Sequence, residues 1–342
     1  MKTRLLLTGM VFGILTCFGI IIFNNWSKPK KITYSKVLPT QTATPTVLKN
    51  EKSPQFVLLS FDGSESMPMW EATRKFAQEM KAQGKSLHFT YFVSGVYFLT
   101  DKNKNYYQGP GQQVGVSKIG FGRDEEDVAK RIEEVRLAQS EGHEIASHLN
   151  GHFDGTNWGE RDWRSEIEQF RKLVPISGIV GIRTPLLARN KYLYAVLKDF
   201  GFSYDSSSTG KSSDWPVKNE YGTWEIPLVT ITLPEIRKST LSMDYNLYLT
   251  QTGGRDVLKK GTKEWESAYR QVLGAYRNYY ANNYQNSRAP IVIGNHFSQW
   301  NNGVYWEAMK TLANEVCDKP DVKCSTFSEL VQYLEKQPLT ER

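Results

Sequence analysis

Short apolar runs and amphipathic stretches alternate along most of the chain. The run FVLLSF (56–61) is continuously apolar, as a fully buried strand is, and the stretch over 70–84 has the helical period and ends in glycine. A second strand-like run, LHFTYFVS (87–94), follows directly. A helix-like stretch leading into a strand-like run then recurs over 125–148, 163–185 and 191–208. This alternation predicts an α/β architecture with parallel strands, whose catalytic groups gather at the carboxyl ends of the strands.

The later part of the chain has more widely spaced elements. The runs TWEIPLVT (223–230), PIVIGNH (290–296) and KCSTFS (323–328) indicate further strands, and 265–283 indicates a helix between the first two. The segment 100–124 is rich in glycine and tyrosine around NYYQGPGQQVG. We expect this segment to be an excursion across a binding face.

The first 26 residues have the pattern of a membrane segment. Lys2 and Arg4 precede an uncharged apolar run over 5–23, which as a helix would be roughly 28 Å long, close to a bilayer span. A cleavable signal normally has a shorter apolar stretch and a small-residue cleavage site. We therefore expect residues 1–26 to be an uncleaved anchor rather than a signal sequence, with lipidation at Cys17 as a weaker alternative.

The next segment, 27–53, is rich in Pro, Thr and Lys and lacks an apolar period, which is typical of a flexible tether. A single catalytic domain is expected over 54–337. The chain of 342 residues carries a net charge of +7. Because its lysines are scattered and no nucleic-acid-binding motif is present, we expect attraction to anionic envelope polymers or lipid headgroups and no nucleic-acid partner. The sequence leaves the oligomeric state open.

Two cysteines lie beyond the apolar leader. Cys317 and Cys324 flank DKPDVK, whose Pro-Asp turn would bring their Cβ atoms within bridging range. A disulfide is favoured over two separate buried thiols, because the leader already indicates export to an oxidising compartment. We expect a periplasmic or cell-surface domain, tethered to the membrane or secreted. Positive charges on both sides of the leader do not decide its orientation.

The histidines give the first indication of metal chemistry. Two of the five form the motif HLNGH, in which His148 and His152 are four residues apart. That spacing would place both on one side of a helical turn, where neutral imidazoles bind Zn²⁺ or a similar ion. The motif alone is a weak signal, since many such pairs face solvent. His88 and His143 lie within strand-like runs, and we interpret both as structural.

Three further residues fall where strands should end: Asp62 in LLSFDGS, Arg183 in GIRTP and His296 in VIGNHFSQW. In this order, with HEIASHLNGH between the first two, the chain resembles the polysaccharide deacetylase family, carbohydrate esterase family four. It is most similar to the chitin deacetylases and peptidoglycan N-acetylglucosamine deacetylases of that family. TYFVSG, GFSYDSS, WEIP and KPDVKCSTFSELVQYL extend the resemblance over roughly 54–334. The implied fold is a distorted (β/α) barrel with about seven or eight strands.

The resemblance also implies a metal site. In the family motif TFDDG the first aspartate is the general base and the second binds the metal with two histidines, which here correspond to His148 and His152. The motif in this chain is SFDGS, so Asp62 takes the place of the base and Gly63 that of the metal-binding aspartate. A divalent metal is expected, with zinc favoured. Asp62 is the favoured third ligand, and Glu65 and Asp154 are the alternatives.

The remaining catalytic roles follow from the same resemblance. Arg183 corresponds to the arginine that orients the catalytic aspartate and keeps it ionised. His296 corresponds to the general acid, and Asp244 to the aspartate that holds its other ring nitrogen, with Asp205 as a competitor. The structural alternatives are that Asp62 merely caps a turn and that Arg183 forms a surface ion pair.

Substrate-binding residues are harder to identify from the sequence. A backbone N–H of the turn 184–186, and Leu186 within it, would hold the oxyanion of a tetrahedral intermediate. Most tryptophans are expected to be core residues, but Trp215 and Trp300 each neighbour a motif, and we include Trp224 with them as candidates for a sugar-binding groove. Gly294 stands where the family has an apolar acetyl-pocket residue, so this pocket is expected to be wider or filled from elsewhere.

These observations lead to a functional hypothesis. We expect a metal-dependent hydrolase that removes N-acetyl groups from a peptidoglycan or chitin-like polymer and releases acetate. The loss of the second aspartate keeps open a catalytically weak, glycan-binding member of the family. A third hypothesis is hydrolysis of another amide, such as a small ring amide, on the same scaffold.

Overall fold

The computed structural model describes residues 53–337. The expected anchor (1–26) and almost all of the expected linker (27–53) lie outside this range, so the structure does not test them. Within 53–337, no helix combines the length and the apolar character needed to cross a membrane. The described residues correspond closely to the catalytic domain expected from the sequence.

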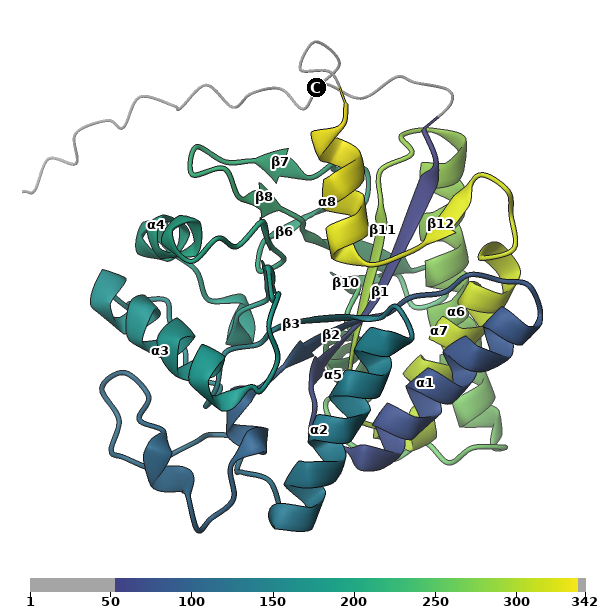
Figure 1. Cartoon of the computed structure of the whole chain (residues 1–342). Helices are drawn as coiled ribbons and strands as arrows, with labels where there is room; N and C mark the ends of the chain where they lie inside the picture. Colours follow the sequence, from purple (N-terminus) through teal and green to yellow (C-terminus); the bar gives the residue numbers. More distant parts are fainter. Residues whose placement is uncertain (1–52, 338–342) are drawn as a thin grey trace, which may run out of the picture. The chain divides into compact units, whose positions relative to one another are not determined.

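A curled, largely parallel sheet forms the centre of the described part of the chain (Figure 1). Its strands are β1 (Gln55–Gly63), β2 (Thr90–Val93), β3 (Glu144–Ser147), β4 (Gly181–Ile182), β5 (Tyr204–Asp205), β7 (Val217–Lys218), β8 (Trp224–Glu225), β11 (Ile291–His296) and β12 (Val322–Cys324). The order is β11-β1-β2-β3-β4-β5-β8-β7, with β12 beside the start of β1. Only the β7–β8 pair within this sheet is antiparallel. The predicted α/β fold with parallel strands is therefore confirmed.

Eight α-helices pack around this sheet within 53–337. They are α1 (Met67–Ala82), α2 (Glu125–Ser140), α3 (Glu160–Leu173), α4 (Lys191–Asp199), α5 (Asp244–Thr252), α6 (Lys263–Gln285), α7 (Trp300–Val316) and α8 (Phe327–Glu335). Figure 1 shows α6 and α7 side by side. Three short 3-10 turns also occur: η1 (Gly95–Phe98), η2 (Lys104–Tyr106) and η3 (Pro185–Leu187).

The strand β1 is mostly apolar, and both of its faces are buried. Val57, Leu59 and Phe61 belong to the larger apolar core, which includes residues of α1, α6 and α7. Phe56 and Leu58 point to the other face and belong to a second core, to which α8 contributes. A strand covered on both faces has no polar alternation, which is why FVLLSF is a continuous apolar run.

The sheet register brings the predicted motifs to one edge. Asp62 at the end of β1 pairs with His296 at the end of β11, and Ser147 at the end of β3 pairs with Ile182 of β4. The residues that follow these last two are His148 and Arg183. Four chemically important side chains therefore emerge at the carboxyl ends of neighbouring parallel strands, as the alternation predicted.

Two of the predicted strands differ from the structure. The run TWEIPLVT is divided at Pro227 into β8 and β9 (Leu228–Leu233), which lie in different sheets. The second sheet has the order β10-β9-β6, with β10 at Lys238–Leu241 and β6 at Thr209–Lys211. Proline has no N–H to donate to a ladder, so a strand change at this position is physically reasonable. In KCSTFS only the start is strand, and Phe327 already begins α8.

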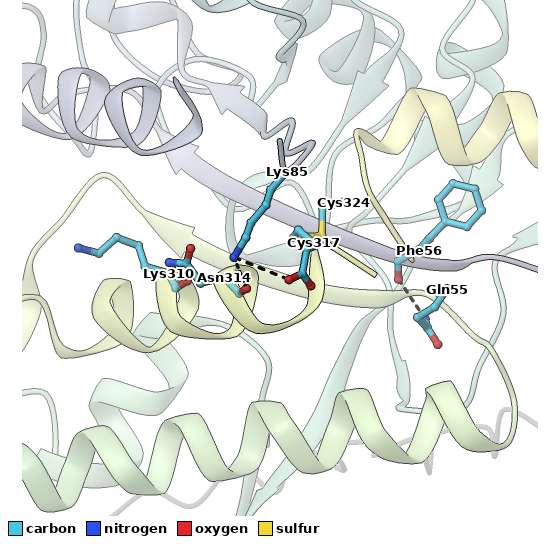
Figure 2. Close-up of a disulfide and its surroundings, with 8 residues drawn as sticks. Gln55, Phe56, Lys85, Lys310, Asn314, Cys317 and Cys324 are labelled. Atoms are coloured by element: carbon cyan, nitrogen blue, oxygen red, sulfur yellow. Dashed lines mark hydrogen bonds and ion pairs between the residues drawn. A yellow bond between two sulfur atoms is a disulfide. The ribbon is translucent and has the colours of Figure 1, made fainter. Parts of the chain in front are cut away.

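The predicted disulfide is confirmed. Cys317 at the end of α7 is bonded to Cys324 in β12, with 5.6 Å between their Cα atoms (Figure 2). The Lys85 Nζ donates a hydrogen bond of 2.8 Å to the Asn314 carbonyl near the same helix end. The bridge thus connects α7 to the strand that pairs with the start of β1.

Candidate active site

A pocket of about 200 Å³ opens at the carboxyl edge of the sheet. Asp62, His148, His152 and His296 all line it. They come from the ends of β1 and β11 and from the loop after β3. The structure therefore brings together the predicted base, the predicted metal histidines and the predicted acid.

The first predicted catalytic pair is an ion pair buried beneath this pocket. Asp62 is only 3% exposed, and its Oδ1 accepts a hydrogen bond of 2.7 Å from Nη1 of Arg183, which is fully buried. Burial alone would raise the pKa of Asp62, but the charge of Arg183 leads the effects that outweigh burial and keep the pKa below its ordinary value. Asp62 is thus an ionised carboxylate at neutral pH, and the surface ion pair and simple turn cap considered from the sequence do not describe it.

The guanidinium of Arg183 is itself held on several sides. Its Nη1 also donates to Ser60 Oγ at 3.0 Å, and its Nη2 donates to Ser206 Oγ at 3.0 Å. The ring of Phe92 lies against the guanidinium, with its centroid 4.2 Å from the Arg183 Cζ. This arrangement fixes the direction from which Asp62 is contacted, because a planar guanidinium donates along fixed directions.

The two histidines of HLNGH lie together, but they are not on a helix. They follow β3 in a loop, and His152 has a left-handed backbone with φ 58°. Their ring centroids are 5.4 Å apart. The predicted proximity of the rings is correct and the predicted helical turn is wrong, because the spacing of four is here spanned by a tight loop.

Both of these imidazoles are neutral near pH 7. Burial lowers the pKa of His148 to about 4, and burial together with the charge of His296 lowers the pKa of His152. The Nδ1–H of His148 donates to the Arg183 carbonyl at 2.7 Å, which leaves Nε2 as the free nitrogen. Orientation of an imidazole by a backbone carbonyl is typical of metal-binding histidines.

These residues fit a divalent metal ion only in part. Two neutral imidazoles are suitable ligands. However, no group of three His, Cys, Asp or Glu side chains in the described chain is close enough together to hold an ion. The arrangement supplies two of the three protein ligands expected from the sequence, and Asp62, the favoured third, is paired with Arg183 instead.

The two alternative third ligands are placed differently. Glu65 lines the same pocket as the two histidines. Asp154 does not line it, and its Oδ1 instead accepts hydrogen bonds from the N–H and hydroxyl of Thr156 at 2.9 and 2.6 Å. The structure therefore separates Glu65 from Asp154, which the sequence did not.

The second predicted catalytic pair joins His296 to Asp244. The His296 Nδ1–H donates to Asp244 Oδ1 at 2.7 Å, and the His296 backbone N–H donates to Oδ2 at 2.7 Å. Burial favours the neutral ring, but the charge of Asp244 and its hydrogen bond outweigh burial and raise the pKa of His296. The competitor Asp205 instead accepts hydrogen bonds from Ser207.

The predicted aromatic residues have different positions. Trp300 lines the pocket, its ring centroid lies 5.2 Å from that of His296, and it stacks on Tyr248. Trp215 is 6% exposed and Trp224 is also buried, and both belong to the second apolar core. The expectation that these two line a sugar-binding groove is therefore wrong for this arrangement.

The turn at 184–186 has one amide suited to an oxyanion. The Thr184 N–H donates to Ser207 Oγ at 2.8 Å, and Pro185 has no N–H. Leu186 remains, with a left-handed backbone and a side chain that is 66% exposed. Leu186 is not among the residues that line the pocket, so its role in holding an oxyanion stays a prediction from the sequence.

The space beside Gly294 is filled from elsewhere. A Cβ placed on Gly294 would lie 2.7 Å from the Met243 Cε and 2.8 Å from its Sδ. Met243 is buried and belongs to the second apolar core. The sequence left open whether the pocket beside Gly294 is wider or is filled by another residue, and the structure shows that Met243 fills it.

Some pocket residues were not identified from the sequence. They are Ser64, Ser94, Tyr97, Ile119, Phe297 and Ser298. Ile119 comes from the expected excursion over 100–124, in which the Lys118 N–H donates to the Gly151 carbonyl at 2.9 Å. The excursion does reach the binding face, as predicted. Serines have no distinctive sequence signal, and only their position relative to SFDGS and TYFVSG could have indicated these.

Comparison with known proteins supports the fold. A protein from Mycobacterium smegmatis assigned as a polysaccharide deacetylase superposes with a TM-score of 0.52 at 18% sequence identity, over 83% of this chain and 91% of the other. The chain has the polysaccharide deacetylase fold. The predicted distorted barrel is therefore confirmed, and the motif resemblance is matched by a structural one.

The same fold includes a second type of enzyme. Puue allantoinase superposes with a TM-score of 0.50 at 14% identity, over 86% of this chain and 94% of the other. The chitin deacetylase of Colletotrichum lindemuthianum has a TM-score of 0.41 at 12% identity, over 77% of this chain and 83% of the other. No protein-family model matches the sequence, and no curated protein matches it either.

Proposed function

We propose that the protein is a metal-dependent N-deacetylase that acts on amino-sugar polymers of the cell envelope, such as peptidoglycan or a chitin-like glycan. The observation that carries this proposal is the presence of two oppositely tuned pairs at one pocket. Asp62 with Arg183 provides an ionised carboxylate, and His296 with Asp244 provides an imidazole whose raised pKa favours its protonated form. Because their pKa values are shifted apart, Asp62 is suited to act as the base of a hydrolysis and His296 as the acid.

Hydrolysis of an N-acetyl amide needs a proton acceptor and a proton donor. In the proposed reaction Asp62 accepts a proton from the attacking water, whose oxygen bonds to the acetyl carbon. His296 donates its proton to the sugar nitrogen as the C–N bond breaks, which releases acetate and a free amine. The Leu186 N–H is proposed to hold the developing oxyanion. A divalent ion held by His148 and His152 would supply Lewis-acid polarisation of the amide carbonyl.

Further features support the proposed substrate and location. Trp300 presents an aromatic ring at the pocket, and aromatic faces commonly bind sugar rings. The Cys317–Cys324 disulfide supports the proposal that the domain works in an oxidising compartment, outside the cytoplasm. The positive net charge supports an anionic envelope polymer as the surface to which the protein is attracted. Tethering by residues 1–26 remains a proposal based on the sequence.

Acetate release is the direct test of this function. The full-length protein would be incubated with acetylated chitooligomers and with peptidoglycan fragments, and each product would be examined for the mass loss of an acetyl group. Release that stops on chelation and returns with zinc is the expected result. Binding of the oligomers without any acetate release would instead identify the glycan-binding protein that the loss of a metal-binding aspartate at Gly63 suggests.

Two variants separate the roles at the metal site. We expect His148→Ala to lose both bound metal and activity, because it removes one of two imidazole ligands. Asp62→Asn is expected to keep the metal and lose activity, because the structure pairs Asp62 with Arg183. Loss of metal in Asp62→Asn would make Asp62 a ligand. Unchanged metal content in His148→Ala would contradict the proposed site.

Ring-amide hydrolysis is the second candidate function. The observation that favours it is the superposition on an allantoinase, which shows the same fold. Allantoin would be included as a substrate in the same assay. Turnover of allantoin without turnover of any oligosaccharide would replace the proposed deacetylation.

A further inference from the structure

Three serines that line the pocket, Ser64, Ser94 and Ser298, have a hydroxyl without a hydrogen-bond partner in the described chain, and the first two are the most deeply buried. Ser64 and Ser94 both line it, and both residues are fully buried. Neither Oγ has a hydrogen-bond partner among residues 53–337. A buried hydroxyl without a partner is unfavourable, so two of them at one pocket point to a polar ligand.

The position of Ser94 is one where a serine hydroxyl usually has a backbone partner, so its lack of a partner in this part of the chain supports a ligand. Ser94 immediately precedes η1, where a serine commonly bonds to a backbone N–H of the following turn. Here the side chain makes no such hydrogen bond. The Ser94 backbone N–H donates instead to the Gly63 carbonyl at 2.8 Å, which ties the serine to the loop after β1.

The backbone at Ser64 is strained. Its φ of 107° lies in a region that residues with a Cβ rarely adopt, directly after Gly63 at φ 109°. Strain of this kind persists only where the surroundings impose it, and it gathers at functional sites. A glycine at position 64 would relieve the strain, but it would also remove the hydroxyl from the pocket.

A buried arginine imposes this conformation. Arg131 of α2 donates to the carbonyls of Ser64 and Glu65 at 2.8 Å each, and to the carbonyl of Tyr97 at 2.8 Å. Its charge is balanced by Asp127, whose Oδ2 lies 3.0 Å from Nη1. The two loops that carry Ser64 and Ser94 are therefore held by one side chain.

We propose that Ser64 and Ser94 form a subsite that binds a ring hydroxyl of the substrate sugar, and that Arg131 is the positioning residue of this subsite. Each serine can donate and accept one hydrogen bond, as a sugar hydroxyl requires. Because Asp127 balances the charge of Arg131, the described groups without a partner at this wall are neutral hydroxyls, and a neutral sugar hydroxyl is the ligand that matches them. This inference rests on the proposed function for its substrate class.

Serine-to-alanine variants test the subsite. Ser64→Ala and Ser94→Ala are compared with Ser325→Ala, which removes another buried hydroxyl without a partner at a position that does not line the pocket. Binding of an acetylated chitotetraose would be measured by calorimetry with the full-length protein. We expect about tenfold weaker binding for each pocket variant and wild-type binding for Ser325→Ala. Equal binding by all three variants and the wild type would overturn the proposal.

A glycine variant separates a binding role from a structural one. Ser64→Gly is expected to raise the melting temperature by about 2 to 4 °C, because it relieves backbone strain. It is expected to weaken oligomer binding as much as Ser64→Ala does. A rise in stability with unchanged binding would mean that the hydroxyl has no ligand.

The same variants distinguish this inference from the proposed deacetylation. For an active enzyme, the ratio of kcat/KM for the oligomer to that for 4-nitrophenyl acetate, which lacks ring hydroxyls, should fall about tenfold in Ser64→Ala. An unchanged ratio would refute the subsite and leave deacetylation intact. Oligomer binding that depends on Ser64 without acetate release would support the subsite and refute the enzyme. Absence of oligomer binding by the wild type would refute the subsite.

Discussion

Two arginines are buried at the carboxyl edge of the sheet, and they hydrogen-bond to different kinds of group. Arg183 directs its Nη groups to side chains, namely the carboxylate of Asp62 and the hydroxyls of Ser60 and Ser206, and only its Nε donates to a backbone carbonyl, that of Ser206. Arg131 directs most of its N–H groups to backbone carbonyls and is balanced by Asp127. The first arrangement sets the charge state of a reacting group. The second sets the conformation of a loop.

This difference shows that a buried arginine can control either the protonation of a neighbouring carboxylate or the conformation of a loop. A guanidinium that contacts a carboxylate changes the free energy of protonation of that carboxylate. A guanidinium that contacts carbonyls changes no protonation state, but it selects one backbone path over others. Variants of the two arginines should therefore divide between catalytic rate and substrate binding.

The largest effect is expected from Arg183→Met. This variant leaves the carboxylate of Asp62 buried without its partner, so the pKa of Asp62 should rise and acetate release should fall about a hundredfold or more. The free energy of unfolding should fall by about 3 to 5 kcal/mol, measured by urea denaturation. In the double variant with Asp62→Asn, stability should recover and activity should not. Full activity of Arg183→Met would remove this ion pair from the mechanism.

The next largest effect is expected from His296→Ala, which leaves both arginines in place. Loss of the general acid should reduce acetate release about a hundredfold, because the amine then departs without its proton. Metal content and the urea midpoint should stay close to those of the wild type. Turnover near the wild-type rate would show that another group supplies the proton.

A smaller and different effect is expected from Arg131→Lys. Lysine keeps the charge beside Asp127 but lacks the planar fork that reaches three carbonyls. The KM for the oligomer should rise about tenfold with a smaller change in kcat, and the free energy of unfolding should fall by about 1 to 3 kcal/mol. Steady-state kinetics on the oligomer measures this split. A fall in kcat at unchanged KM would show that Arg131 acts on the chemistry, and the contrast with Arg183 would disappear.

The smallest effect concerns a histidine remote from the pocket. Burial lowers the pKa of His143 to about 4, from an ordinary value of 6.5. The unfolded chain therefore binds a proton between pH 6.5 and pH 4 that the folded chain does not, so His143 should reduce stability as the pH falls through this window. We expect the loss of unfolding free energy from pH 7 to pH 4 to be smaller in His143→Gln. An identical loss in the variant and the wild type would contradict this.

Much of the fold was predictable because its signals are local. The continuous apolar run of β1 and the amphipathic stretches of α1 to α4 identify strands and helices without reference to distant residues. The break of TWEIPLVT at Pro227 was missed, because its apolar pattern continues through a point where the chain passes from one sheet to another. The helix α7 was also missed. Its buried residues include Val304, Tyr305 and Trp306 in succession, so the helical period is obscured.

The candidate site was predictable in its reactive residues but not in its supporting ones. Asp62, Arg183 and His296 were identified through their place at strand ends and the order of their motifs. Ser64 and Ser94 carry no such signal, since serine is common in loops. Trp215 and Trp224 were misassigned, because proximity to a motif in sequence does not say which side of the sheet a ring faces.

The sequence by itself indicated the candidate catalytic side chains and placed them at the carboxyl ends of parallel strands. It also indicated the disulfide, because seven residues and a turn nearly specify that geometry. Only the tertiary structure decided that Asp244 rather than Asp205 holds His296, that Met243 fills the space beside Gly294, and that Arg131 binds the carbonyl of Ser64. The physical reason is that each of these depends on contacts between segments far apart in the chain, which only the packing of the sheet and its helices brings together.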